Sequence, residues 1–223
     1  PFRLTGAQQR CIDDILSDLR RGAPMNRLVQ GDVGSGKTMV AAAAAYLTAA
    51  NHRQTALMAP TEILARQHYN SLKTQFAKAG LEVVLLTGGM GAAAKREANA
   101  IISSQKPALI VGTHGLISAN VEFSQLALVI TDEQHRFGVA QRALLAAKGA
   151  KPHVLVMSAT PIPRTLALIM YGDLDVSILD GMPPGRIPVK TYSVDESYTE
   201  RIRAFIRRTV ASGRQVYVVC PAV

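Results

Sequence analysis

Residues 31–38, with the sequence GDVGSGKT, have the residue types and spacing of a loop that binds phosphate. Glycines let the backbone adopt positive φ and bring N–H groups up to phosphate oxygens, and the N-terminus of a following helix adds partial positive charge. Lys37 supplies a full charge for the β- and γ-phosphates, and Thr38 offers a hydroxyl to Mg²⁺. The sequence therefore predicts a nucleoside triphosphate site formed by Gly31, Asp32, Gly34, Ser35, Gly36, Lys37 and Thr38.

Two adjacent carboxylates, Asp132 and Glu133, follow the continuous apolar run 126–130. Such a run is typical of a strand buried in a parallel sheet, where a charge is costly unless it is paired or binds a metal. Asp132 is predicted to hold Mg²⁺, and Glu133 to orient and deprotonate the attacking water. Candidates for sensing the γ-phosphate come directly after them. The expected catalytic residues are Lys37, Asp132, Glu133, Gln134 and His135.

Polar residues and glycines also follow three other predicted strands, 54–59, 82–86 and 108–111. In an open α/β sheet, ligands bind just beyond the carboxyl ends of the strands. A second ligand, a polyanion, is therefore expected near Pro60, Thr61, Arg66, Thr87, Gly88, Thr113 and His114. The alternative for the first two is simple helix initiation, and a lone histidine is usually structural.

The elements that must position these residues alternate between strand and helix along the chain. A short strand at 27–30 leads into the phosphate loop, and the alanine-rich stretch 39–50 after it favours a helix. Further helices are expected at 6–20, 63–79, 92–103 and 164–171, and further strands at 153–157 and 175–179. Alternation of this kind predicts an α/β fold in which helices cover both faces of a parallel sheet.

Composition limits the class of protein. The chain of 223 residues carries a net charge of +9, which favours a polyanion such as nucleic acid as partner, although ordinary basic solubility is the alternative. Two distant cysteines make neither a disulfide framework nor a metal cluster and predict the reducing cytoplasm. The apolar run 40–50 is shorter than the ~20 residues of a membrane span, so we expect no membrane segment.

The composition changes at residues 181–187, which contain two adjacent prolines between glycines and predict a linker. Residues 1–180 are expected to form the first domain. Residues 188–223 predict a strand at 189–194, a helix at 197–212 and a strand at 214–220. One such unit cannot bury a core of its own, so we expect the start of a second domain within an excised piece of a longer protein.

The motifs resemble those of superfamily 2 helicases, in the same order along nearly the whole chain. They are Gln8 and the segments 31–38, 59–62, 87–88, 112–114, 132–135 and 158–160. Within that superfamily, DEQHRFGV at 132–139, ATPIPRTLA at 159–167, GDLD at 172–175 and PPGR at 183–186 resemble the RecG family of bacterial ATP-dependent DNA helicases, which remodel stalled replication forks.

The resemblance implies a RecA-like fold, ATP and Mg²⁺ as cofactors, and branched or forked DNA as partner. It implies that Gln8, whose amide can match the edge of adenine, contacts the base, although a solvated glutamine is the simpler interpretation. It implies that the strand-end residues described above touch the DNA backbone. The residues that would couple nucleotide state to motion are Ser158, Ala159 and Thr160.

The resemblance also implies partners within the parent chain, namely a wedge domain and the rest of a second motor domain. Arginine fingers from that second domain can contribute ~10³–10⁵ in rate, so this chain alone should bind ATP but hydrolyse it very slowly.

Three alternatives stay open. The transcription-repair coupling factor, a duplex translocase, shares HRFGV and TPIPRTL but usually has Glu where Gln134 stands. A phosphate-loop kinase is disfavoured by the adjacent Asp132 and Glu133, because a kinase needs no water-activating glutamate there. A binding module that has lost its ATPase activity is disfavoured by the intact Lys37 and Thr38.

Overall fold

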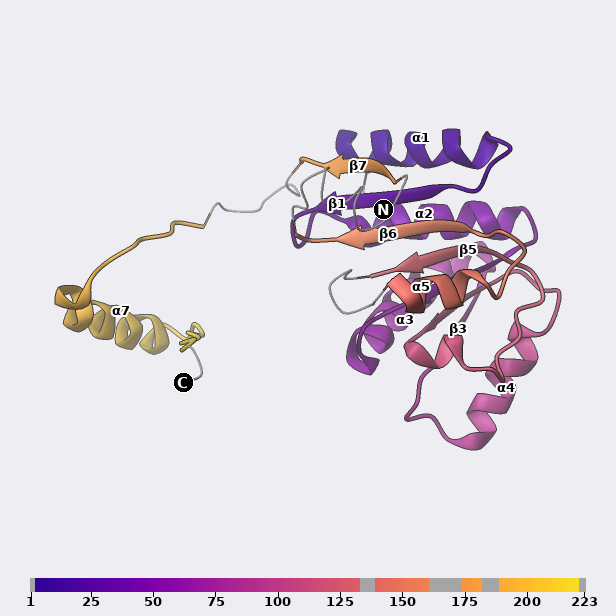
Figure 1. Ribbon diagram of the computed structural model, residues 1–223. Helices are drawn as coiled ribbons and strands as arrows, with labels where there is room; N and C mark the ends of the chain where they lie inside the picture. Colours follow the sequence, from indigo (N-terminus) through magenta and orange to yellow (C-terminus); the bar gives the residue numbers. More distant parts are fainter. Residues whose placement is uncertain (1–2, 133–138, 161–173, 182–188, 221–223) are drawn as a thin grey trace. The chain divides into compact units, whose positions relative to one another are not determined.

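The computed structural model describes residues 3–132, 139–160, 174–181 and 189–220 (Figure 1). The chain divides into two compact units, Pro1–Pro184 and Gly185–Val223. The first unit is an α/β domain around a seven-stranded sheet with the order β3-β4-β2-β5-β6-β1-β7. The strands are β1 (Asn26–Gly31), β2 (Gln54–Met58), β3 (Glu82–Leu86), β4 (Ala108–Gly112), β5 (Leu126–Thr131), β6 (His153–Ser158) and β7 (Asp175–Leu179).

Every strand pair in this sheet is parallel, so all carboxyl ends lie at one edge (Figure 1). Strands β2 and β4 are buried along their whole length, as expected where helices cover both faces and the strands are continuously apolar. The predicted class, a parallel α/β sheet, is confirmed.

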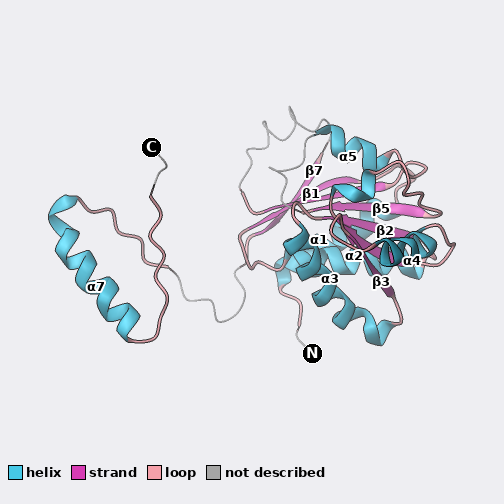
Figure 2. Cartoon of the chain, turned by 90° about the horizontal axis from the view of Figure 1, so that it is seen from below, coloured by secondary structure: helices cyan, strands magenta, loops and turns pink. Residues whose placement is uncertain are grey.

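Helices cover both faces of the sheet. The helices α1 (Gly6–Arg20), α2 (Lys37–Ala50) and α3 (Glu62–Phe76) pack on one face through a single apolar cluster. The helices α4 (Ala92–Ile102) and α5 (Val139–Ala146), with the 3-10 turn η2 (His114–Ile117), pack on the other (Figure 2). Helix α5 was not predicted from the sequence. The predicted helix at 164–171 lies outside the described residues.

The long helix expected at 63–79 is shorter in the structure. Helix α3 ends at Phe76 and continues as the 3-10 turn η1, Ala77–Ala79. Gly80, with φ of 65°, ends that turn in the left-handed conformation that glycine tolerates best. No helix of the described part of the chain is long and apolar enough to cross a membrane.

A buried ionic cluster fixes α1 against the sheet. The guanidinium of Arg27, on β1, donates from Nε to Asp18 at 2.6 Å and from an Nη atom to Ser177 on β7 at 2.8 Å. Ser177 in turn donates to Asp14 on α1 at 2.6 Å. Because β1 leads directly into the phosphate loop, this cluster ties α1, which carries Gln8, to the strand that carries the loop.

The second unit contains the 3-10 turn η4 (Glu196–Tyr198) and the helix α7 (Thr199–Ala211). The strands expected at 189–194 and 214–220 are absent, since those described residues form no ladder. A strand exists only where another strand accepts its backbone hydrogen bonds, and the described part of this unit supplies no such neighbour. Apolar side chains on α7, Ile202 and Phe205 among them, are exposed.

Candidate functional site

The loop between β1 and α2 is built to receive an anion. Gly34 and Gly36 have φ of 81° and 90°, a conformation that residues with a Cβ rarely adopt. Gly36 is the N-cap of α2 and offers no side-chain acceptor to the first N–H groups of the helix. The Oγ atom of Ser35 is buried with no partner among the described residues. Phosphate oxygens would satisfy these donors.

Lys37 is half-buried, and its ammonium is hydrogen-bonded to the backbone of this loop. Its Nζ donates to the carbonyl of Gly31 at 2.7 Å and to that of Asp32 at 3.0 Å. A phosphate oxygen carries negative charge and is therefore a stronger acceptor than a neutral carbonyl. A bound triphosphate would take over these bonds without a large movement of the side chain.

Gln8 lies against the phosphate loop. Its Oε1 accepts from the backbone N–H of Thr5 at 2.9 Å, which closes a capping box at the start of α1. Its Nε2 donates to the carbonyl of Ser35 at 3.2 Å. An amide has two N–H donors and two lone pairs, so one of each is left for a purine edge. Gln8 thus holds the loop and keeps the capacity to contact a base.

Asp132 follows the carboxyl end of β5. Its backbone N–H donates to the carbonyl of Met58 at 3.0 Å, which extends the β2–β5 ladder and fixes the position of the residue. Its Oδ2 lies 2.6 Å from Nε2 of His68 on α3. His68 was missed from the sequence; the available signal is a histidine within the otherwise apolar buried face of α3.

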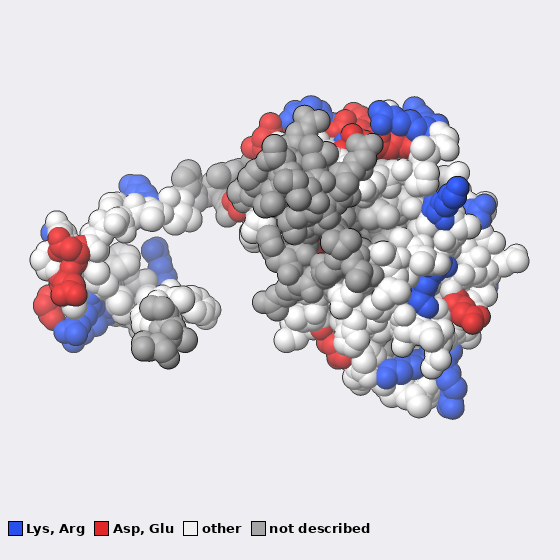
Figure 3. All heavy atoms as spheres, in the orientation of Figure 1, with Lys and Arg blue, Asp and Glu red and all other residues white. Residues whose placement is uncertain are grey.

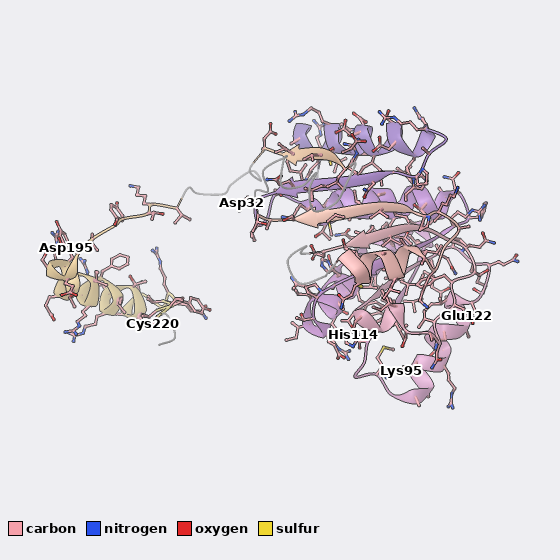
Figure 4. The ribbon with its side chains drawn as sticks, viewed as in Figure 1. Asp32, Lys95, His114, Glu122, Asp195 and Cys220 are labelled. Atoms are coloured by element: carbon pink, nitrogen blue, oxygen red, sulfur yellow. The ribbon has the colours of Figure 1, made fainter. Side chains whose placement is uncertain are left out.

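The loop and Asp132 lie at the same edge of the sheet. Strands β5, β6 and β1 are adjacent in that order, and Gln30 pairs with Ser158 at the ends of β1 and β6. Figure 4 shows Asp32 at the arrowhead end of these strands and Glu122 at the opposite end. Between the loop and Asp132, the Oγ of Ser158 lies 3.0 Å from Oγ1 of Thr160. Ala159 lies between these two residues at the same strand end.

The residues at this edge fit a magnesium nucleotide. The described residues contain no group of three or more His, Cys, Asp or Glu that could hold a metal ion by themselves. Mg²⁺ is usually bound by one or two protein oxygens together with substrate phosphates and water. The carboxylate of Asp132 and the hydroxyl of Thr38 are such hard oxygen donors, and the Ser35 hydroxyl, which has no partner among the described residues, would be available to a phosphate oxygen.

The other half of the same edge carries the candidate polyanion contacts. Arg66, Gly88 and His114 are exposed, and Pro60 and Thr61 are half-buried. The loop at Gly88 is joined to α3 because Glu62 accepts from the backbone N–H of Gly89 at 2.7 Å. We name Pro60, Thr61, Arg66, Gly88 and His114 the accessible rim.

Two of the predicted contacts are placed differently. The side chains of Thr87 and Thr113 are only 1% and 2% exposed, and their hydroxyls have no partner among the described residues. These residues directly follow β3 and β4 and face the interior of this structure. Their backbone and the residues beside them remain the candidates.

The predicted catalytic residues Glu133, Gln134 and His135 lie outside the described residues. On the face shown in Figure 3, Lys and Arg form separate groups, and the group over α1 is mixed with Asp and Glu.

A parallel sheet with a phosphate loop after β1 and an acidic residue after β5, both at its carboxyl edge, defines a RecA-like nucleotide-binding domain of the P-loop class. The family comparison is more specific. The chain belongs to the DEAD/DEAH box helicase family, which matches residues 5–169.

Several curated relatives of this chain are named ATP-dependent DNA helicase RecG. The chain is 55% identical to that of Synechocystis sp. over 223 residues, covering 100% of this chain and 27% of the relative. It is 49% identical to that of Bacillus subtilis, covering 100% of this chain and 33% of the relative. A solved structure of RecG bound to a three-way DNA junction matches with a TM-score of 0.86 and 43% identity, covering 100% of this chain and 30% of the other.

The chain therefore spans about a third or less of the relatives that it matches. The predicted resemblance to RecG is confirmed, and the transcription-repair coupling factor is not favoured.

Proposed function

We propose that this chain is the ATP-binding motor domain of a RecG-type DNA helicase, which couples ATP hydrolysis to the remodelling of branched DNA and stalled replication forks. The observation that carries the proposal is the shared carboxyl edge of β1, β6 and β5, where the phosphate loop, Ser158 and Asp132 lie together. The full-length similarity to RecG helicases supports the substrate class.

In this proposal ATP binds at the phosphate loop. The backbone of the loop and Lys37 hold the phosphates, Thr38 and Asp132 hold Mg²⁺, and Gln8 contacts adenine. Magnesium, when bound, neutralises charge on the phosphate oxygens. Glu133 positions and deprotonates the attacking water, and Gln134 and His135 sense the γ-phosphate. Lys37, Asp132 and Glu133 are the groups that we assign to hydrolysis itself.

Ser158, Ala159 and Thr160 are proposed to couple nucleotide state to motion. They follow β6, which lies between the strand of the phosphate loop and the strand of Asp132. The hydrogen bond between the hydroxyls of Ser158 and Thr160 would let a displacement of one residue move the other.

DNA is proposed to lie along the accessible rim. Exposed Arg66, together with backbone N–H groups near Gly88 and Thr113, would contact phosphates without reading sequence. Contacts of this kind release counterions, so binding should weaken steeply with salt. A translocating motor needs such sequence-independent contacts.

The proposal is tested on the full-length protein that contains this chain. ATP hydrolysis is measured with a three-way DNA junction, with linear duplex and without DNA. We expect the junction to stimulate hydrolysis most and Lys37→Ala to abolish it. Lys78→Ala is the matched control, because Lys78 is an exposed lysine outside the loop and should keep the activity of the parent.

Two results would contradict the proposal. One is hydrolysis that does not respond to DNA, and the other is a Lys37→Ala protein that binds nucleotide as tightly as the parent. The isolated 223-residue chain should bind ATP but turn it over at least ~10³-fold more slowly than the whole protein, since the second motor domain supplies the arginine fingers.

A further inference from the structure

Helix α3 has one polar residue on its buried face. Its buried residues are Ala65, His68, Leu72 and Phe76, which follow each other at helical spacing. Ala65 and Leu72 are 0% exposed and belong to the apolar cluster beneath α1, α2 and α3. Without a hydrogen-bond partner, the imidazole of His68 would be costly to bury among such neighbours. We therefore ask which group it pairs with.

That partner is the carboxylate assigned to Mg²⁺. Nε2 of His68 lies 2.6 Å from Oδ2 of Asp132, and the two side chains are only 11% and 14% exposed. An ionised carboxylate only accepts hydrogen bonds, so Nε2 carries the proton and donates it. The bond occupies Oδ2 and leaves Oδ1 of Asp132 for another ligand. It also limits the rotation of the carboxylate.

The N-terminal end of α3 belongs to the accessible rim. Thr61 caps the helix, since its hydroxyl accepts from the backbone N–H of Leu64 at 3.3 Å. Glu62, the first residue of α3, holds the loop at Gly89 through a 2.7 Å hydrogen bond. Arg66 is exposed one turn further along. One helix therefore carries rim residues on its exposed part and a hydrogen bond to Asp132 on its buried face.

We propose that His68 is a positioning residue that sets the orientation of Asp132 for Mg²⁺ and passes displacements of α3 at the DNA rim to that carboxylate. The inference rests on the proposed function and deepens it, because it names the contact through which DNA binding reaches the metal site. His68 lies in the second turn of the 15-residue helix α3, so a shift of the first turn also shifts His68. The 2.6 Å bond then changes the direction of the Asp132 carboxylate.

The expected effect of removing His68 can be estimated from other metal sites. Removing a group that hydrogen-bonds a metal ligand commonly costs ~10–100-fold in metal affinity or activity. We expect a loss of that size in the Mg²⁺-dependent part of nucleotide affinity. We expect no change in the part that persists without metal, because among the described residues the hydrogen bond of the His68 side chain goes to Asp132 and not to the phosphate loop.

The experiment uses the full-length protein with His68→Leu and His68→Gln. A fluorescent ATP analogue is titrated with Mg²⁺ and, separately, with EDTA, and the ratio of the two affinities is compared between proteins. His68→Leu removes the donor and should lower the ratio ~10–100-fold. His68→Gln keeps an N–H donor on a side chain of similar reach and should restore most of it.

A second readout addresses the link to DNA. The stimulation of ATP hydrolysis by a three-way junction should fall more in His68→Leu than the hydrolysis without DNA does. Leu72→Ala is the matched control, since it removes a fully buried residue from the same face of α3 without touching Asp132. It should lower thermal stability and leave the affinity ratio unchanged.

The inference is overturned if His68→Leu keeps the affinity ratio of the parent, or if Leu72→Ala lowers that ratio as much as His68→Leu does. Failure of the proposed function looks different. In that case the unmodified protein itself would show no Mg²⁺-dependent nucleotide binding and no stimulation by DNA.

Discussion

A Cβ atom on Gly36 would lie 2.0 Å from Nε2 of Gln8. The side chain of Gln8, on α1, therefore packs directly against Gly36. The same amide of Gln8 donates a hydrogen bond to the carbonyl of Ser35 within the phosphate loop. Because the start of α1 packs against the phosphate loop, we expect a substitution in either segment to alter nucleotide affinity.

We therefore predict that Gly36→Ala disrupts nucleotide binding. The substitution places a side chain at φ of 90°, which costs about 1–2 kcal/mol, and drives it into Gln8. Gly22→Ala is the control, because a Cβ there meets nothing within 4 Å. Fluorescent nucleotide titration should show a loss of ~10-fold in affinity for Gly36→Ala, equivalent to ~1.4 kcal/mol and so within that range. Equal affinities of the two variants would contradict the packing argument.

At the DNA rim, we predict opposite outcomes for an exposed and a buried residue. Arg66→Ala should reduce junction affinity and lower the slope of log affinity against log salt by ~1, the loss of one phosphate contact. Thr113→Val should leave both unchanged, since its hydroxyl is buried and unpartnered among the described residues. Binding isotherms at several salt concentrations separate the two. A DNA defect in Thr113→Val would mean that the hydroxyl turns outward in the complex.

For the ionic cluster under α1, we predict that removing one partner is costly. Burial opposes the charge of Arg27, but its hydrogen bond and ion pair with Asp18 outweigh this and raise its pKa above the usual value. Asp18→Leu should cost about 3–5 kcal/mol of unfolding free energy, because it leaves a buried guanidinium without its closest partner. Urea unfolding measures the loss.

Two further proteins complete that measurement. Asp180→Ala breaks the exposed pair with Arg10, whose side chains are 64% and 67% exposed, and should change stability by no more than ~0.5 kcal/mol. Combining Asp18→Leu with Arg27→Met should recover much of the loss, since no buried charge is then left alone. A double variant as unstable as Asp18→Leu alone would show that packing, rather than charge, dominates here.

His153 should make stability depend on pH. Burial lowers the pKa of His153 despite the opposing effect of Asp18, and its Nδ1 accepts from the backbone N–H of Met25 at 2.9 Å. Because the folded pKa is the lower one, the unfolded chain binds the proton more readily. The contribution of neutral His153 to the free energy of unfolding is therefore complete above the unfolded pKa of ~6.5. It is lost as the pH falls from there through the folded pKa.

The measurement compares the parent with His153→Asn, whose amide oxygen can accept the same bond without titrating. The unfolding free energies of the two proteins should converge below pH ~6.5 as the parent loses its advantage. Curves that stay parallel down to the acid limit would exclude a role for this bond.

The two thiols should react at very different rates. Burial raises the pKa of Cys11 to about 11, so very little thiolate is present near neutral pH, while Cys220 is exposed. A thiol reagent should label the native chain once, and Cys220→Ser should remove that label. Cys11→Ala should keep it. Labelling of Cys11 should follow unfolding in urea, and rapid labelling of both sites in the native chain would place Cys11 at the surface.

Local patterns sufficed to predict the strands of the sheet along the chain, the phosphate loop and the class of sheet. The GDVGSGKT spacing and the apolar run at 126–130 depend only on neighbouring residues. The same reasoning failed at 189–194 and 214–220, where strand formation needs a partner that local sequence does not contain.

Which side chains contact one another depends on the tertiary fold. Residues 68 and 132 are 64 positions apart, and nothing in either segment signals the other. The packing of α3 against β3 and β4 places His68 2.6 Å from Asp132 at the end of β5. The burial of Thr87 and Thr113 likewise follows from which face of the sheet each residue occupies, and that depends on the helices packed over it. Motif spacing thus predicts the chemistry of an edge, whereas the hydrogen-bond partners at that edge depend on contacts between distant segments.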